Sequence, residues 1–418
     1  MWMKKSIVLL LLFIMISKAS AGDAAASTYA NVSNLFGIDP DAGMNSFLTL
    51  LIPGGGKYEG MGTAFTAMSV DSGFLDANPA GSSFIKNSEL TFFHNNWIAD
   101  TNLESVTYTS RWDNFGIGIG GKFLYLPFTG IDDWGDRAKN EDGSFSSGYY
   151  TETVTTFNIA YTFLDDYYYH GIAVGANFKM AYRGVPYSIA PDQSAFAMMV
   201  DLGIQSKFNV LKFFSSRDKN FAFGLVLKNL GTEFIRDPDP LPTMVSTGIA
   251  YSPLRPMTWA FDVNIPFNLD GTPSESVYYA AGLDLSITNF LSVQSGFMLK
   301  TGLPRFSLGS SLDMERFSLT ANYTLDLTTQ VNTLDRFSLA LKLNLGDFGR
   351  MSRVERAQLL YLQGLEEYAN GDISKAISLW EESLTVRPEF TPATEMIETA
   401  RKTQELNQII QENQTIDE

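Results

Sequence analysis

The segment Asp335–Phe348, DRFSLALKLNLGDF, decides the fold. Every second side chain from Phe337 to Leu345 is apolar, and the side chains between them are polar, charged or small. The alternation continues for longer than the roughly five or six residues of an average soluble strand. Because a period of two places all the apolar groups on one face, we interpret the segment as a strand of a membrane barrel. Its apolar face would contact lipid and its polar face a water-filled lumen.

Segments with the same alternation, bounded by turn residues, recur throughout the chain upstream. There are about fourteen, an even number, as expected of a bacterial single-chain barrel. The sequence therefore predicts an all-β transmembrane barrel of antiparallel strands, preceded by a plug and followed by a small α-helical domain. The predicted strands are 88–97, 104–113, 114–125, 149–163, 168–182, 195–209, 220–229, 243–252, 257–267, 275–287, 290–300, 304–314, 316–327 and 335–346.

The charged residues of these strands support the same orientation. A charge on the lipid-facing side of a barrel costs about 2–4 kcal/mol at mid-bilayer. The parity that places leucines outside places seven charged side chains in the lumen, where this cost is avoided. They are Lys179, Lys228, Asp262, Asp284, Lys300, Asp326 and Lys342.

The N-terminus has the features of an export signal. Lys4 and Lys5 precede an apolar run over 7–16, and Ala19-Ser20-Ala21 forms a small-residue cleavage site. The alternative, a membrane anchor, is disfavoured because the run is too short to cross about 30 Å of hydrocarbon. We predict a signal peptide over 1–21 and location of the mature chain in the bacterial outer membrane.

Residues 22–87 precede the first clean alternation and are rich in small residues, as in Gly60–Gly81. They form either a surface leader with turns or a plug folded inside the barrel, and we favour the plug. The barrel itself would then occupy 88–349.

The chain changes character after Gly349. Residues 350–418 read as three helices, and 351–418 contain 13 acidic and 6 basic residues, a net charge of −7. Ala376 and Trp380 fall where the first two helices of a tetratricopeptide-like unit would cross. This tail, expected in the periplasm, is either a stability module or a docking site for a periplasmic protein.

Composition excludes several functions. The net charge of −16 argues against nucleic acid, and the absence of Cys rules out disulfides and thiolate metal sites. The two histidines, His94 and His170, read as wall residues rather than parts of a metal or hydrolase site. We therefore expect no enzyme activity, no catalytic or metal-binding residues and no cofactor.

The long connection over 126–148 contains apolar side chains among acidic ones. Exposed apolar groups in a surface loop can form a capture surface, for which Phe128 and Trp134 are the candidates. The alternative is a loop folded on its own aromatic residues.

The signal peptide, the strand number and the leader Gly60–Gly81, GMGTAFTAMSVDSGFLDANPAG, together resemble the FadL family of outer-membrane long-chain fatty-acid transporters. The leader also looks like that of PorV/PorQ-type proteins, and the tail is similar to that of FadL-like proteins of spirochaetes. The resemblance implies a hatch containing Asn78, Pro79 and Ala80. It also implies a third strand, here 114–125, that kinks to open a gap in the wall.

The glycines that would form this lateral gap are Gly118, Gly120 and Gly121. The basic groups that hold a carboxylate in the family have no residue-by-residue match here. Lys179, Arg183 and Lys228 are our candidates for that role, because they fall on the polar faces of their strands.

The predicted function is passive uptake of hydrophobic molecules, with long-chain fatty acids as the expected ligand class and outer-membrane lipid as the surroundings. An apolar channel can select chains without chemistry, because each buried CH₂ contributes about 0.8 kcal/mol. Substrate would land on the outer loops and leave sideways into the bilayer. The alternative is a non-transporting, PorV-like scaffold that docks periplasmic or secreted partners through its tail.

Overall fold

A computed structural model describes most of the chain. It covers residues 45–416, apart from 98–100, 130–138, 140–142, 145–146, 166–169, 187–192, 215–218, 236–238, 270, 272–273, 301–302 and 327–335. The predicted signal peptide and the predicted capture residue Trp134 lie outside the described residues.

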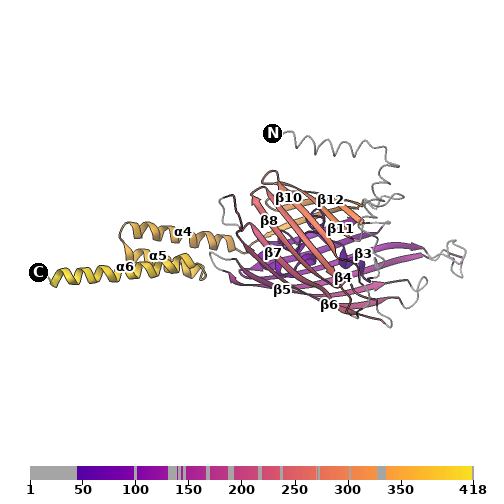
Figure 1. The fold of residues 1–418 in the computed structure, drawn as a ribbon, viewed down its shortest axis with the longest axis horizontal. Helices are drawn as coiled ribbons and strands as arrows, with labels where there is room; N and C mark the ends of the chain where they lie inside the picture. The colour runs from indigo at the N-terminus through magenta and orange to yellow at the C-terminus, as the bar shows by residue number, and fades with distance from the viewer. Residues whose placement is uncertain are drawn as a thin grey trace.

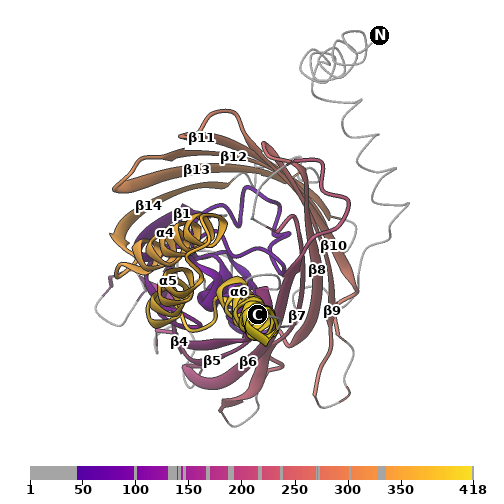
Figure 2. The same ribbon diagram turned by 90° about the vertical axis from the view of Figure 1, so that its left-hand side faces the viewer.

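Fourteen antiparallel strands close into a barrel in which each strand pairs with its sequence neighbours (Figure 1). The ring is closed by pairing of β1 with β14, which lie side by side in Figure 2. The predicted fold class and all fourteen predicted strands are confirmed. The strands are β1 (Ser88–Asn96), β2 (Asn102–Trp112), β3 (Phe115–Thr129), β4 (Ser147–Asp165), β5 (His170–Gly184), β6 (Ala195–Phe208), β7 (Phe221–Phe234), β8 (Met244–Leu254), β9 (Met257–Pro266), β10 (Tyr278–Ser286), β11 (Leu291–Lys300), β12 (Leu303–Asp313), β13 (Phe317–Asp326) and β14 (Arg336–Gly346).

The two faces of the wall follow the predicted parity. On β14, Phe337, Leu339 and Leu341 are 47%, 37% and 38% exposed on the outside, while Ser338 and Ala340 between them are buried. All seven charged residues predicted to face the lumen are buried or nearly so. The apolar outer belt is what a lipid environment requires.

The lumen is occupied by protein, so the polar faces of the strands contact a segment of the chain rather than the water of an open pore. Residues 45–87, called the plug from here on, lie inside the ring (Figure 2). The plug has little regular structure: η1 (Leu48–Leu51), α3 (Phe74–Ala77) and η2 (Pro79–Phe84). Its apolar side chains, such as Met61 and Phe65, pack on inward-facing alanines of the wall.

Three helices follow β14 and extend from one end of the barrel, called here the tail end (Figure 1). They are α4 (Arg350–Ala369), α5 (Ile373–Val386) and α6 (Thr391–Ile416). Ala376 and Trp380 are fully buried between them. Trp380 lies so close to α4 that a Cβ on Gly364 would be 2.3 Å from its Nε1. Among the described residues, no helix has both the length and the apolar character needed to cross a membrane.

The tail is joined to the barrel by a few exposed polar contacts and one ring contact. Arg353 Nη2 lies 2.8 Å from Asp113 Oδ1 in the β2–β3 turn, and the rings of Trp112 and Phe348 are 5.9 Å apart. Asp347 accepts hydrogen bonds from the backbone N–H groups of Met351 and Gly349, which lower the pKa of its carboxyl. The junction orients α4 without burying much surface.

The parity of β14 predicts that the cost of a charge depends on its depth. Leu341→Arg, in the middle of the lipid-facing row, should destabilise the barrel by about 2–4 kcal/mol, whereas Leu345→Arg at the rim should cost about 0–1 kcal/mol. Reversible urea unfolding in lipid vesicles measures both. Equal costs for the two variants would contradict the placement of this face in lipid.

Candidate functional site

Polar side chains of the wall form hydrogen bonds with the peptide groups of the plug. Asp262 Oδ2 accepts from the backbone N–H groups of Phe65 and Thr66 at 2.9 and 2.8 Å. Amide side chains donate to plug carbonyls, as Asn177 does to Leu75 at 2.8 Å. Because the plug is mostly irregular, its buried peptide groups need such partners. The polar inward face thus binds the plug backbone rather than lining a water-filled pore.

A band of wall glycines lies where the plug backbone touches the wall. The glycines form three cross-strand pairs, and a Cβ at each would collide with plug atoms: Gly296, for example, would be 1.9 Å from Gly62 N. Only glycine allows backbone to approach backbone so closely. The sequence interpretation missed this band, although glycines on the polar faces of strands are its signal. The pairs are Gly175–Gly203, Gly224–Gly248 and Gly282–Gly296.

The Asn-Pro-Ala motif lies in the plug, against β5 and β6. The Asn78 side-chain oxygen accepts from the Ala80 N–H at 3.1 Å, and its amide donates to the Thr66 and Ile204 carbonyls at 3.0 Å each. Gly203 allows this approach, because a Cβ there would be 2.1 Å from Asn78 Oδ1. The motif connects two plug segments to the wall, and its role as a moving hatch remains a prediction.

The predicted gap at the third strand does not appear along the described length of β3. β3 pairs without a register shift with β2, from Asn102↔Tyr125 to Trp112↔Phe115, and with β4 along its whole length. Gly118 and Gly120 face inward, where a Cβ would be 2.9 and 3.4 Å from Leu75 of the plug. A Cβ at Gly121 would meet no heavy atom within 4 Å outside its chain neighbours. The two inward glycines therefore make room for the plug, and lateral exit at this strand has no structural support.

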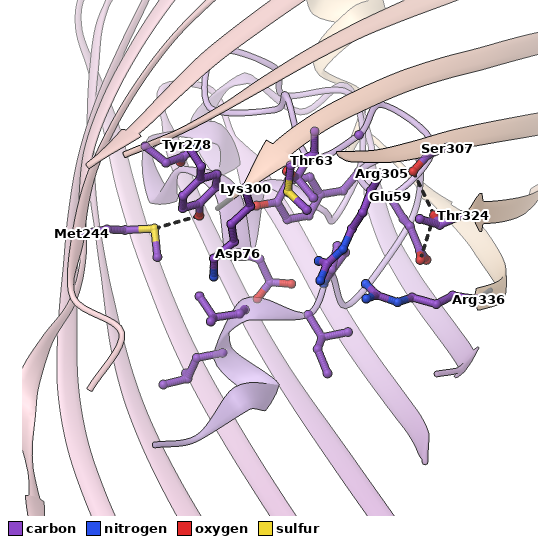
Figure 3. A pocket seen from close by; sticks show the side chains of 18 of the residues that line it. Glu59, Thr63, Asp76, Met244, Tyr278, Lys300, Arg305, Ser307, Thr324 and Arg336 are labelled. Atoms are coloured by element: carbon purple, nitrogen blue, oxygen red, sulfur yellow. Dashed lines mark hydrogen bonds between the residues drawn. The ribbon is translucent and has the colours of Figure 1, made fainter. Parts of the chain in front are cut away.

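A cavity of about 80 Å³, drawn in Figure 3, lies between the plug and the ends of the strands that are farthest from the tail; we call it the far cavity. One part of its lining is apolar, including Leu51, Ile52 and Met244, and the rest is polar and mainly basic. Figure 3 shows Arg305 and Arg336 extending into this space from β12 and β14. The charged lining residues are Glu59, Asp76, Lys228, Lys300, Arg305 and Arg336.

Two of the four bases in this far cavity lack an acidic partner among the described residues. Lys300 lies 2.6 Å from Glu275 and Arg305 3.4 Å from Asp326. By contrast, no described carboxylate forms an ion pair with Lys228 or Arg336. The Arg336 guanidinium lies over the Trp97 ring at 5.0 Å, and its Nε is buried without a hydrogen bond. Buried cations without a partner favour an anionic ligand.

A β-bulge in β7 turns Asn229 into the lumen beside Lys228, which already faces inward by parity. The β6–β7 register shifts between Val200 and Leu202, so that Lys228 and Asn229 both lie opposite Asp201. Asn229 has a positive φ of 56°, and its N–H donates to Asp201 Oδ1 at 2.7 Å. Both neighbouring side chains are buried as a result. Bulges commonly redirect side chains next to functional sites.

The other predicted site residues have different surroundings. Lys179 and Arg183 are inward as predicted, but Asp201 and Glu233 lie 2.7 Å from them, so neither base is available to a ligand in this arrangement. Phe128, predicted in a loop, belongs to β3, which runs four residues past its predicted end.

The histidines do not form a site. His94 Nδ1 lies 2.8 Å from Glu104 Oε1, and both side chains are nearly half exposed. His170 begins β5. No group of three His, Asp or Glu side chains is arranged to hold a metal ion in the part of the chain that the structure describes.

A second cavity of about 120 Å³ lies below the plug, toward the tail end. It is lined by Ser72 and Asp71 of the plug and by residues of β1 and β12–β14. The plug segment Gly56–Glu59 separates the two cavities, because Gly56 and Lys57 line the lower one and the next two residues line the upper one. Lys57 Nζ is 3.3 Å from Asp284 Oδ2, which fixes this segment to β10.

The closed ring and its apolar outer belt define the class: a transmembrane β-barrel of the outer-membrane type, here with its lumen occupied by its own N-terminal segment. Within that class the chain belongs to UPF0164, described as "Uncharacterised protein family (UPF0164)", whose family model matches residues 22–347. A UPF0164 protein of Treponema pallidum (strain Nichols) is 30% identical over 390 residues, or 91% of this chain and 88% of the relative. Another from the same organism is 26% identical over 392 residues, or 84% and 74%.

Solved structures with a comparable arrangement include the Pseudomonas putida toluene transporter TodX. It has 11% sequence identity and a TM-score of 0.44, over 70% of this chain and 96% of that one. A Pseudomonas aeruginosa FadL homologue has 10% identity and a TM-score of 0.41, over 68% of this chain and 97% of that one.

The bonds to Asp262 predict that its loss loosens the plug. Asp262→Ala leaves the Phe65 and Thr66 N–H groups unpaired in the interior, at about 1–3 kcal/mol each, whereas Asp262→Asn keeps an acceptor oxygen. In planar bilayers, Asp262→Ala should open far more often than the native barrel, and Asp262→Asn should be intermediate.

Ser246→Ala is the matched control, because Ser246 is buried but bonds to Asn264 of the wall rather than to the plug. If Ser246→Ala opened the barrel as often as Asp262→Ala, the bonds to the plug would not be what keeps it closed.

Proposed function

We propose that the protein is a passive outer-membrane channel for amphipathic anions, with long-chain fatty acids as the representative class. The far cavity is the observation that carries this proposal. It sets apolar side chains of the plug and wall beside Lys228 and Arg336, the two bases without a described acidic partner. A carboxylate would pair with these bases while the first methylenes of its chain contact Leu51, Ile52 and Met244.

The energetics favour a ligand of this kind. A charge-assisted hydrogen bond contributes roughly 1.5–3 kcal/mol, and each buried CH₂ adds about 0.8 kcal/mol. A neutral hydrocarbon would gain only the second contribution and would leave Lys228 and Arg336 without a close ion-pair partner. The site therefore discriminates by head group first and by chain second.

Passage requires the plug to move. The far cavity, at about 80 Å³, is much smaller than the roughly 300–1,000 Å³ of pockets that enclose a drug-sized ligand. Both cavities are lined by β12, β13 and β14, on the two sides of Gly56–Glu59. We place the route along this part of the wall, so displacement of Gly56–Glu59 would join the two cavities.

The head-group preference predicts a selective effect of Lys228→Met. This change keeps the length of the side chain but removes its charge, so oleate should bind the folded barrel roughly tenfold more weakly. Methyl oleate, which has no carboxylate, should bind about equally to both forms. Equilibrium binding to detergent-folded protein measures both ligands.

Lys342→Met is the control for this comparison, since Lys342 is also inward but pairs with Glu89 near the tail end. If Lys228→Met and Lys342→Met lost oleate affinity equally, the far cavity would not be the binding site for the head group.

The route predicts that fixing the plug blocks uptake. The hydroxyl oxygens of Ser72 in the plug and Thr91 in β1 are 3.1 Å apart, so Ser72→Cys with Thr91→Cys can form a disulfide in a chain that has no other cysteine. Oxidised cells expressing this variant should lose accumulation of radiolabelled oleate and regain it on reduction.

A second pair, Ser83→Cys with Thr162→Cys, is the matched control. Its hydroxyl oxygens are 2.9 Å apart, and it fixes only the plug's root next to β1. This variant should transport in both redox states. Unchanged uptake by the oxidised Ser72–Thr91 variant would exclude a route through the plug.

The filled lumen also favours a second function, that of a non-transporting scaffold. In that case the tail would carry the activity, and its exposed Leu359 and Leu362, 57% and 59% accessible on α4, would contact a periplasmic protein. Removal of 350–418 would then abolish capture of that periplasmic protein, while oleate binding stayed intact. A scaffold would lose its activity on this deletion, whereas a channel would keep its uptake of oleate.

A further inference from the structure

The connection between β6 and β7 exposes large apolar side chains at the tail end of the barrel. Leu211 is 73% and Phe213 69% exposed, among the most exposed large hydrophobic residues of the described chain. The Tyr251 hydroxyl donates to the Leu211 carbonyl at 2.9 Å, which draws the connection toward β8. The connection runs from the end of β6 at Phe208 to the start of β7 at Phe221, and this length allows it to reach β8.

The next turn along the same edge repeats the composition. Leu254, 45% exposed, closes β8 and is followed by Arg255, just as Leu211 is followed by Lys212. Together Leu211, Lys212, Phe213, Leu254 and Arg255 form what we call the basal patch. It combines exposed apolar groups with two bases in a chain of net charge −16.

The basal patch is continuous with the lipid-facing belt. The rings of Phe208 and Phe221 are 4.8 Å apart, and those of Phe221 and Tyr251 are 6.2 Å apart, so aromatic side chains connect the belt to the patch. Aromatic residues mark the membrane interface of barrels. The patch therefore lies at the depth of lipid head groups, where its leucines and phenylalanine can enter the acyl region.

We infer that the basal patch binds anionic phospholipid in the leaflet at the tail end of the barrel. The apolar side chains anchor it at the acyl boundary, and Lys212 and Arg255 pair with the phosphates and the negative surface. A base near an anionic surface strengthens binding by roughly fivefold. The patch thereby selects the charge of the surrounding lipid and fixes the height of the barrel in the membrane, independently of what the channel carries.

The absence of cysteine from the chain allows a direct test. Phe213→Cys, labelled with the environment-sensitive dye NBD and reconstituted at full length, is placed in phosphatidylcholine vesicles with or without phosphatidylglycerol. A small share of either lipid carries a nitroxide quencher near its glycerol. Leu269→Cys, 61% exposed at the far end, is the matched site.

At position 213 we expect several-fold stronger quenching by labelled phosphatidylglycerol than by labelled phosphatidylcholine, and at 269 no such preference. Lys212→Gln with Arg255→Gln should reduce the preference by at least fivefold, as should high salt. Lys375→Gln with Lys402→Gln in the tail removes the same amount of charge and should leave the preference for phosphatidylglycerol at position 213 unchanged. Heat-dependent migration in gels confirms that each variant is folded.

Three outcomes would overturn the inference. If the dye at position 213 emitted as it does in water, the patch would not lie in the membrane. Equal quenching by the two lipids would remove the charge selectivity. If, in vesicles lacking phosphatidylglycerol, the dye at 213 became shielded from water as the protein concentration rose, that result would mean that the patch binds the acidic tail of a second copy.

Discussion

The structure depends on hydrogen bonds between polar wall side chains and the peptide groups of an irregular segment inside the barrel. A segment such as 45–87 cannot satisfy its own buried N–H and carbonyl groups, and leaving each unpaired would cost a few kcal/mol (about 1–3). Asp262, Asn158, Asn177 and Asn322 supply those partners from four strands. Barrel and plug are therefore one cooperative unit rather than a pore with a loose stopper.

This constraint shapes the rest of the interior. Where side chains bond to the plug, the wall has Asp and Asn; where the backbones touch, it has paired glycines. Buried ion pairs neutralise most of the remaining inward charges, such as Lys179 with Asp201. Lys228 and Arg336 differ from these pairs, and they lie at the far cavity, where the plug leaves space. In an interior whose charges are otherwise mostly paired, these two bases are the groups most suited to hold an anionic ligand.

The sequence predicted the barrel well because the lipid face requires a physical pattern that nothing else in the chain imitates. Leu339 and Leu341 must face hydrocarbon, so their alternation with Ser338 and Ala340 was sufficient to predict the strand and its orientation. The content of the lumen was harder to predict. A polar inward row is equally compatible with water and with a plug backbone, so the plug was favoured from the resemblance to the FadL family and not from the strand pattern.

The candidate site was predictable only in part. Lys228 was found by parity, but no alternation shows the bulge that places Asn229 beside it. Lys179 and Arg183 followed the same rule, yet their acids, Asp201 and Glu233, come from other strands, whose register was unknown. Gly118 and Gly120 were assigned to a wall gap because the resemblance to the FadL family implied one at this strand. Their actual neighbour, Leu75, lies in a segment that showed no periodicity.

Amide hydrogen exchange of the plug, measured by mass spectrometry on the folded barrel in lipid, tests the central claim most directly. If wall side chains bond the plug backbone, peptides over residues 58–68, which include Phe65 and Thr66, should exchange as slowly as the strands around them. Exchange of this segment within seconds, while the strands stay protected, would show that the plug is not bound to the wall and would contradict the account.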